Sequence, residues 1–332
     1  MKSVLLITTG GTIASAQGAE GLAPSFSAET LLRHVSALTE YYSIETRELL
    51  NLDSSNIAAD EWIVIARAIY EALPTHDGVV ITHGTDTMAY TASMVSFMLK
   101  GLKKPVVFTG SQMPIDNPLT DARNNLYTAF AAVEKGIPGV TIAFDRRIIP
   151  GCRAVKVRTM GFEAFESVNA GDLGQVFADG LRPLCPIPKN PDSYVELRDK
   201  ICRDVFLLKL TPGINPDVLG MLQVMNYRGI VIEAFGAGGM QFVRTSLLHH
   251  LRALADAGIA VVVCSQCLYE ASNLGIYEVG QKLLSCGVIS ARDMTTEAVV
   301  TKLMWALGQT GDLRRVAQIF NTNYCGEITL EG

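Results

Sequence analysis

Three apolar runs of strand length punctuate the first 110 residues, and each ends in a turn that contains threonine and glycine. The turns are Thr8-Thr9-Gly10-Gly11-Thr12-Ile13, Thr82-His83-Gly84-Thr85-Asp86-Thr87 and Thr109-Gly110-Ser111. A β-branched run that ends at glycine is typical of a buried strand whose backbone turns tightly. One such turn alone indicates only an ordinary strand-to-loop connection. Three of them predict a repeated arrangement.

Helical patterns separate these runs. Residues 28–37 have a helical pattern, 43–48 alternate like a strand, and apolar residues between Trp62 and Leu73 fall on one helical face. Further helices are expected up to about Lys100 and through residues 123–126. Strands that alternate with helices predict βαβ units and a mostly parallel sheet. The three turns are therefore expected at the carboxyl edge of this sheet, where open α/β sheets bind ligands.

The remainder of the chain predicts a second α/β unit. Residues 139–145 read as a strand, and residues 146–159 as a hairpin around Pro150-Gly151 whose second arm carries Lys156. Four prolines between Pro183 and Pro191 mark a linker. Strands near 205–210, 230–235 and 260–266 then alternate with helices near 215–226, 245–257, 278–286 and 295–308. We therefore predict an N-terminal domain over residues 1–182, a linker over 183–203 and a smaller C-terminal α/β domain over 204–332.

The composition of the chain argues against several classes of binding partner. Of the 332 residues, 48% are hydrophobic and 18% are charged, and the net charge is -5. Because the chain has no basic run, it offers no positively charged surface of the kind that binds nucleic acid. No stretch approaches the roughly 20 apolar residues that span a bilayer. Seven cysteines, an odd number, favour reduced thiols in the cytoplasm. The pair Cys264 and Cys267 has no second pair at zinc-site spacing, so we expect no metal and no other cofactor.

The candidate chemistry rests on hydroxyl groups. A threonine is a weak nucleophile unless a base lies beside it, and the chain has no G-x-S-x-G, H-E-x-x-H, P-loop or G-x-G-x-x-G motif. The remaining candidate groups are threonines, an aspartate and a lysine. A lysine can serve as the base, because removal from water lowers the pKa of its ammonium group. Asp86 has three possible roles: it binds a substrate ammonium group, orients such a lysine, or caps the next helix.

Several of these motifs, taken together, resemble the two-threonine L-asparaginases. They occur in the order Thr9-Gly10-Gly11-Thr12-Ile13, Asp53-Ser54-Ser55, His83-Gly84-Thr85-Asp86-Thr87-Met88, Thr109-Gly110-Ser111-Gln112 and Cys152-Arg153-Ala154-Val155-Lys156. The resemblance continues through Ile232-Glu233-Ala234-Phe235-Gly236 and Lys302-Leu303-Met304-Trp305. Each motif is weak alone, but together they cover nearly the whole chain, and they are most similar to the bacterial cytosolic, type I branch.

This resemblance implies that the chain hydrolyses L-asparagine to L-aspartate and ammonia without metal or organic cofactor. Thr12 would attack the amide, and Thr85, Asp86 and Lys156 would form the second hydroxyl–acid–base set. Asp53, Ser54 and Ser55 would bind the amino acid end of the substrate, helped by Asp86. Gly11, Gly84 and Ser111 are the other residues expected to bind the substrate. The family also implies a homodimer or homotetramer.

One departure and two alternatives accompany this prediction. Secreted asparaginases carry a tyrosine in a mobile loop near the first threonine, whereas residues 14–27, which also read as a mobile loop, contain none. The group that activates Thr12 therefore stays open, with Thr85 and Lys156 as candidates. The alternatives are an asparaginase-like subunit of a tRNA-dependent amidotransferase and a catalytically silent amino acid-binding protein.

Overall fold

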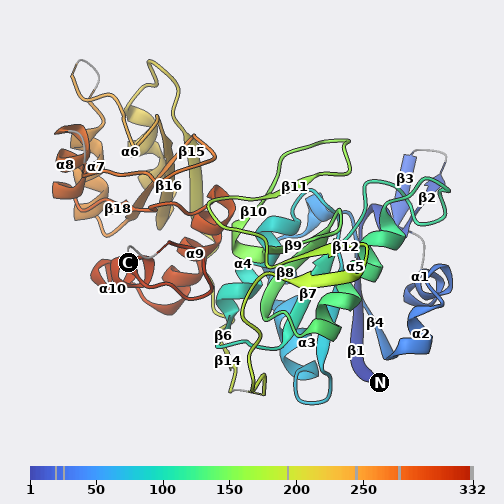
Figure 1. Ribbon diagram of the computed structural model, residues 1–332. Coiled ribbons are helices and arrows are strands. Elements are labelled where there is room, and N and C mark those ends of the chain that lie inside the picture. The colour runs from blue at the N-terminus through green and yellow to red at the C-terminus, as the bar shows by residue number, and fades with distance from the viewer. Residues whose placement is uncertain (19–20, 25–26, 193, 244–245, 276–277, 330–332) are drawn as a thin grey trace. The chain divides into compact units, whose positions relative to one another are not determined.

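Two structural units make up the chain, Met1–Asp199 and Lys200–Gly332. The computed structural model describes residues 1–18, 21–24, 27–192, 194–243, 246–275 and 278–329, and its elements are labelled in Figure 1.

An eight-stranded sheet forms the centre of the first unit, in the order β13-β12-β9-β8-β7-β5-β1-β4. Its strands are β1 (Lys2–Gly10), β4 (Tyr42–Leu52), β5 (Gly78–Thr82), β7 (Pro105–Thr109), β8 (Gly139–Phe144), β9 (Arg147–Pro150), β12 (Gly174–Phe177) and β13 (Gly180–Pro183). The five strands β4, β1, β5, β7 and β8 are parallel, and the other three are antiparallel. The prediction of a mostly parallel α/β sheet is confirmed.

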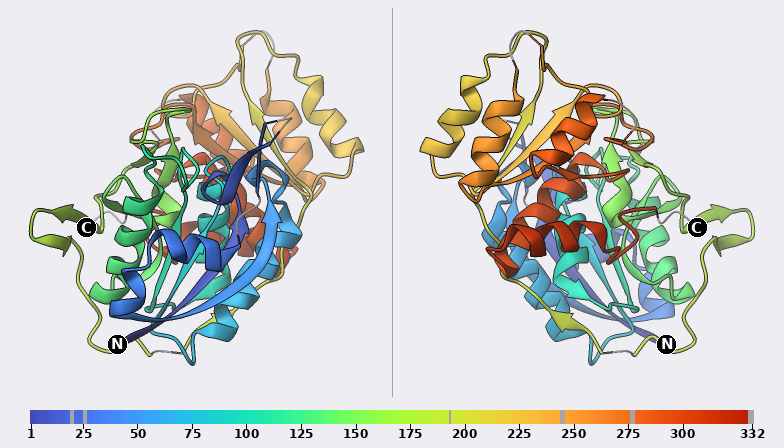
Figure 2. Two further views of the ribbon diagram at one scale, coloured as in Figure 1. Left: turned by 90° about the vertical axis from the view of Figure 1, so that its right-hand side faces the viewer. Right: turned by 90° about the vertical axis from the view of Figure 1, so that its left-hand side faces the viewer.

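Helices cover both faces of this sheet, which explains why β5 and β7 are buried along their whole length. The helices are α1 (Ala28–His34), α2 (Leu38–Tyr41), α3 (Ala59–Ala72), α4 (Met88–Met98) and α5 (Ala122–Lys135). The apolar faces of α1, α2 and α5 share one core with Val4, Leu6, Val80 and Val107 of the strands. The turned views show α1 and α2 beside β4, which follows them in the chain (Figure 2).

Four short strands of the first unit form two pairs outside the main sheet. They are β2 (Ser15–Gly18) paired with β3 (Gly21–Pro24), and β6 (Leu99–Lys100) paired with β14 (Glu196–Leu197). The β2–β3 hairpin lies within residues 14–27, for which the sequence predicts a mobile loop. Residues 19–20 and 25–26 of that loop lie outside the described residues.

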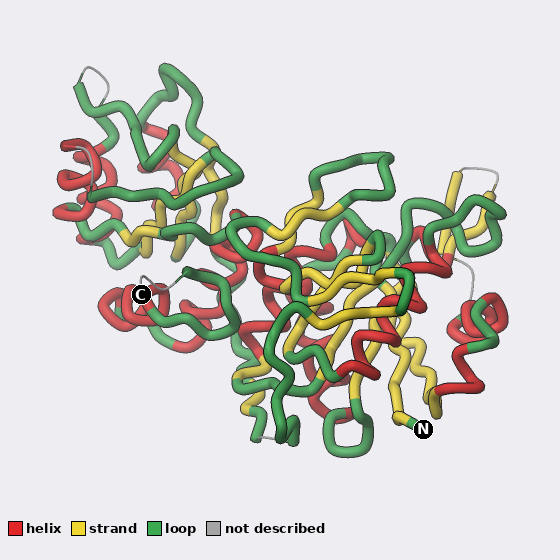
Figure 3. The backbone as a smooth tube through the Cα atoms, viewed as in Figure 1, coloured by secondary structure: helices red, strands yellow, loops and turns green. Residues whose placement is uncertain are grey.

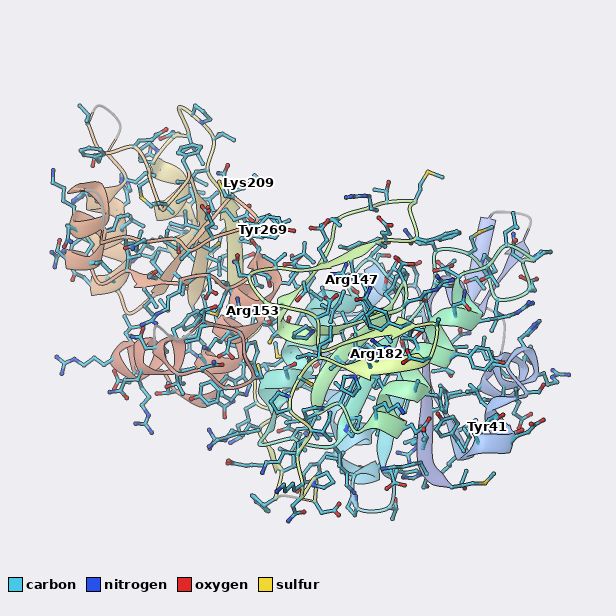
Figure 4. All side chains as sticks on the ribbon, viewed as in Figure 1. Tyr41, Arg147, Arg153, Arg182, Lys209 and Tyr269 are labelled. Carbon is cyan, nitrogen blue, oxygen red and sulfur yellow. The ribbon has the colours of Figure 1, made fainter. Side chains whose placement is uncertain are left out.

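The predicted hairpin around Pro150-Gly151 is wrong. After β9 the chain enters a 3-10 turn, Gly151–Arg153, and Arg153, which is labelled in Figure 4, is only 2% exposed there. The next strand, β10 (Ala154–Lys156), pairs instead with β11 (Phe165–Ser167), and Lys156 lies opposite Phe165. The alternation of apolar and basic residues within 146–159 could not reveal this pairing, because the partner strand of β10 lies further along the chain.

The second unit contains a parallel sheet in the order β15-β16-β17-β18. Its strands are β15 (Val205–Lys209), β16 (Gly229–Ala234), β17 (Ala260–Ser265) and β18 (Ile289–Ser290), and its helices are α6 (Asp217–Val224), α7 (Leu248–Asp256), α8 (Glu278–Ser285), α9 (Thr296–Gln309) and α10 (Leu313–Asn321). The sequence predicts all of these except β18 and α10. A buried ion pair between Lys302 and Glu327, 2.6 Å apart, ties α9 to the segment after α10.

None of the helices in the described part of the chain combines the length and the apolar character that crossing a membrane requires.

Candidate active site

The turn after β1 depends on glycine. Gly10 and Gly11 have φ angles of 104° and 82°, in the left-handed region that side chains disfavour. A Cβ atom on Gly11 would lie 2.4 Å from the backbone nitrogen of Gly84, so no larger residue fits. Thr12 then opens a short 3-10 turn in which the next two residues, Ile13 and Ala14, are buried. These buried residues fix the backbone, while Thr12 itself stays partly exposed.

The turns after β1, β4 and β5 pack directly on one another. A Cβ atom on Gly84 would lie 2.6 Å from the hydroxyl oxygen of Ser54, just as one on Gly11 would meet Gly84. The hydroxyl of Thr87 donates to the carbonyl of Ser54 at 2.7 Å. Because β4, β1 and β5 are parallel neighbours, their carboxyl ends meet at one edge. The structure therefore brings the two threonine turns and the Asp53-Ser54-Ser55 turn together.

Lys156 reaches this edge from β10. Its Nζ donates to the hydroxyl oxygen of Thr85 at 2.8 Å and forms an ion pair with Oδ1 of Asp86 at 2.5 Å. Thr85 is buried, whereas the side chain of Asp86 is 65% exposed and that of Lys156 is 18% exposed. The N-cap residue of α4 is Thr87 rather than Asp86. Asp86 therefore contacts the lysine and does not cap the helix, while its exposed carboxylate can also meet a ligand.

The Asp53 carboxylate follows β4 at the start of a second 3-10 turn, Ser54–Asn56. Its Oδ1 accepts hydrogen bonds from the hydroxyl of Ser55 at 2.6 Å and from the backbone N–H of Ser55 at 2.8 Å. These bonds favour the charged form and lower the pKa of Asp53 below its usual value. A second negative charge therefore stands at this edge at neutral pH, in addition to any charge on Asp86.

In the turn after β7, the side chain that faces Thr85 is Gln112 and not the expected Ser111. Ser111 is 1% exposed, and its hydroxyl donates to the carbonyl of Met113 within the same turn. The neighbouring Gln112 instead extends toward Thr85, whose hydroxyl donates to Gln112 Oε1 at 3.4 Å. The sequence motif includes Gln112, but nothing in the pattern indicates which side chain of the turn faces Thr85.

A buried histidine supports the second threonine turn. His83 is 0% exposed; its Nδ1 lies 2.7 Å from the carbonyl of Gly84, and its Nε2 lies 2.9 Å from the hydroxyl of Thr91. Because a carbonyl can only accept, Nδ1 carries the proton and Nε2 accepts from Thr91. Trp62 Nε1 donates to the same Thr91 hydroxyl at 3.0 Å. Burial lowers the pKa of His83 to about 4, so this chain holds a neutral imidazole.

The arrangement can support nucleophilic chemistry on a small charged molecule. It offers two threonine hydroxyls, one of them bonded to a lysine, and carboxylates that suit an ammonium group. Among the described residues, no three His, Cys, Asp or Glu side chains form a group that could hold a metal ion.

Comparison with known proteins identifies the family of this chain. Residues 3–184 match the family model described as asparaginase, N-terminal, and residues 204–320 match the glutaminase/asparaginase C-terminal domain. The chain belongs to the asparaginase family. An L-asparaginase from Thermococcus kodakarensis is 42% identical over 98% of this chain and 99% of its own. A solved structure of a thermostable L-asparaginase from the same organism is also 42% identical, with a TM-score of 0.93 over 99% of this chain and 100% of its own.

Two other relatives bear on the position of this chain within the asparaginase family. A glutamyl-tRNA(Gln) amidotransferase subunit of Pyrococcus furiosus is 37% identical over 99% of this chain, which covers 77% of that protein. The structure of L-asparaginase I from Vibrio cholerae is 30% identical, with a TM-score of 0.87 over 99% of both chains. The higher identity is thus to an archaeal L-asparaginase, and the family assignment does not extend to the bacterial type I branch in particular.

Proposed function

We propose that this chain hydrolyses the side-chain amide of L-asparagine to L-aspartate and ammonia, with Thr12 as the nucleophile. The observation that carries the proposal is the close packing of the Thr12 turn on the Thr85 turn, where Lys156 bonds to Thr85 and Asp86. The identity to an L-asparaginase over nearly the whole chain supports the same activity.

The reaction divides into two steps. The Thr12 oxygen attacks the amide carbon, its proton passes to a base, and the nitrogen leaves as ammonia after it takes up a proton. A water molecule then attacks the resulting aspartyl ester, releases aspartate and restores the Thr12 hydroxyl. Thr85 and Lys156 form the hydroxyl–amine pair that can move a proton in either step.

Asparagine also presents an ammonium group and a carboxylate, which need opposite partners. We assign the ammonium group to the carboxylates of Asp53 and Asp86, because the pKa of Asp53 is lowered and the Asp86 side chain is exposed. The substrate carboxylate suits the Ser54 and Ser55 turn and the backbone N–H groups beside Gly11 and Gly84. Ser111 belongs to the wall of the site and not to its donors, because its hydroxyl is engaged with Met113.

The proposal includes the setting of the enzyme. We place the chain in the cytoplasm, since all seven cysteines are free thiols. From the family resemblance we propose that it forms a homodimer or homotetramer of the type I kind. From the sequence we also propose that the N-terminal domain ends at residue 182 and that the C-terminal domain begins at residue 204.

The main alternative is a protein that supplies ammonia to a charged tRNA, which the 37% identity to the Pyrococcus furiosus amidotransferase chain favours. Ammonia release by the purified chain, measured with asparagine and then with glutamine in the absence of tRNA, tests the proposal. Turnover of asparagine alone supports the hydrolase. Release only in the presence of charged tRNA and further subunits would identify the amidotransferase, and binding without release would identify an amino acid-binding protein.

A further inference from the structure

Gln112 connects three parts of the candidate site. Its backbone belongs to the turn after β7, its side-chain oxygen lies 3.4 Å from the hydroxyl of Thr85, and its side-chain nitrogen lies 3.3 Å and 3.1 Å from the carbonyls of Thr159 and Gly161. Those two carbonyls belong to the loop that joins β10 to β11, directly after Lys156. One side chain thus contacts both the hydroxyl and the hairpin that carries the lysine.

The orientation of the Gln112 amide follows from its partners. Two carbonyl oxygens can only accept, so the NH₂ group faces Thr159 and Gly161, and the oxygen must face Thr85. The Thr85 oxygen accepts from Lys156 and its proton points at Gln112. The hydrogen bonds therefore run in one direction, from Lys156 through Thr85 and Gln112 to the loop.

The backbone of Gln112 is fixed independently of these contacts. The carboxylate of Asp121, the N-cap residue of α5, accepts the N–H groups of Gln112 at 3.0 Å and of Met113 at 3.2 Å. The buried side chain of Asn125 donates to the same carboxylate at 3.0 Å and to the carbonyl of Gly110 at 2.9 Å. Gln112 consequently projects from a rigid turn.

The loop that Gln112 contacts is exposed to solvent from residue 158 to residue 163. It is anchored at its base by a hydrogen bond from the N–H of Val157 to the carbonyl of Ala164, at 2.8 Å. Its tip includes Met160, which is 85% exposed between the two carbonyls that Gln112 contacts. In Figure 3 this loop is the green segment that connects the short strands β10 and β11 labelled in Figure 1.

We propose that Gln112 is a positioning residue for the Thr85–Lys156 pair, a role that rests on the proposed function. It gives the Thr85 proton an acceptor while Lys156 donates to the Thr85 oxygen, and it restrains the hairpin from which Lys156 projects. Both effects hold the proton-transfer geometry before the substrate arrives, and misplacement by about 1 Å can cost roughly 10² in rate. The role predicts a loss in kcat rather than in KM.

The test uses the full-length chain and three variants. Gln112→Met keeps the length of the side chain and removes every polar atom. Gln112→Glu keeps an oxygen opposite Thr85 but cannot donate to the loop. The matched control is Gln309→Met in the second unit, where the glutamine also donates to two backbone carbonyls, those of Lys200 at 2.7 Å and Trp305 at 3.3 Å.

Two measurements are made on each variant: amide hydrogen exchange of residues 157–164 and steady-state ammonia release from asparagine. For Gln112→Met we expect kcat to fall about 5- to 100-fold, the range from one lost hydrogen bond to a misplaced base, with KM changed less than about 3-fold. Exchange in the loop should accelerate in both Gln112 variants. Gln309→Met should match the parent chain in both measurements.

The outcomes separate the inference from the function on which it rests. Unchanged kcat in Gln112→Met, with or without faster exchange, overturns the positioning role, and so does slow exchange like that of the control. If the parent chain releases no ammonia from asparagine, the proposed function fails and the catalytic role of Gln112 fails with it. Accelerated exchange would then still establish that Gln112 restrains the hairpin.

Discussion

The two threonine turns share a local sequence pattern but have very different surroundings. Each follows a buried parallel strand, and each places a threonine directly after glycine. The hydroxyl of Thr85 is bonded to Lys156 and Gln112, and the buried His83 supports its turn. By contrast, no residue in the described part of the chain forms a hydrogen bond with the Thr12 side chain.

This difference teaches that partners, and not the local motif, distinguish the two hydroxyls. Thr85 lies in a network that can hold and move a proton. Thr12 is partly exposed on a rigid backbone, as a nucleophile must be if a substrate is to reach it. The predictions below test that division of roles, in order of decreasing effect on turnover.

Thr12→Ala should lower kcat by at least about three orders of magnitude, because it removes the attacking oxygen from a preformed turn. Steady-state ammonia release measures the loss, and thermal unfolding should show a folded protein. Thr12→Ser, which keeps a hydroxyl, is the matched control and should retain far more activity. Near-normal turnover in the alanine variant would mean that Thr12 is not the nucleophile.

Lys156→Met should lower kcat by roughly 10² to 10⁴ and change asparagine binding much less, because a base acts on the proton in transit. The control is Lys104→Met. Lys104 is equally enclosed, with a side chain 15% exposed, but its Nζ donates to the carbonyls of Leu73 and His76. The control should lose stability and keep its kcat. Equal effects of the two variants would reduce Lys156 to a structural role.

Asp86→Asn should raise KM for asparagine by about 10-fold, since a charge-assisted hydrogen bond to the ammonium group becomes a neutral one. A smaller fall in kcat is expected as well, because the same carboxylate pairs with Lys156. Asp77→Asn is the control, as Asp77 accepts from the N–H of Ser3 at the opposite edge of the sheet. A fall in kcat at constant KM would show that Asp86 only orients the lysine.

His83 should affect stability and not turnover at neutral pH. Its pKa is lowered from about 6.5 to about 4, so the unfolded chain binds a proton that the folded chain refuses between these values. The stability present above pH 6.5 is therefore lost as the pH falls toward 4, by roughly 3 kcal/mol. His83→Asn, whose amide can still donate to Gly84, should remove this dependence in denaturant titrations at pH 7, 5.5 and 4. Parallel curves for the two proteins would contradict this assignment.

Much of the fold could be predicted because its signals are local. Apolar runs such as Val79–Ile81 and glycine turns such as Gly10-Gly11 give the parallel strands of the first sheet, and the alternation of strands and helices gives the βαβ order. The hairpin that carries Lys156 was predicted incorrectly, because β10 pairs with a strand that begins nine residues after β10 ends. Strand pairing depends on the partner, and the pattern of one segment does not identify it.

The sequence by itself determined the residue types of the candidate site and the edge at which most of them meet, because parallel strands place their ends together. It could not determine which of them touch. Ser111 turns into its own loop, Gln112 reaches Thr85, and His83 is enclosed beneath the turn. Those choices arise from packing between segments far apart in the chain, such as the fit of Gly11 against Gly84 and of Gly84 against Ser54, and only the tertiary structure decides them.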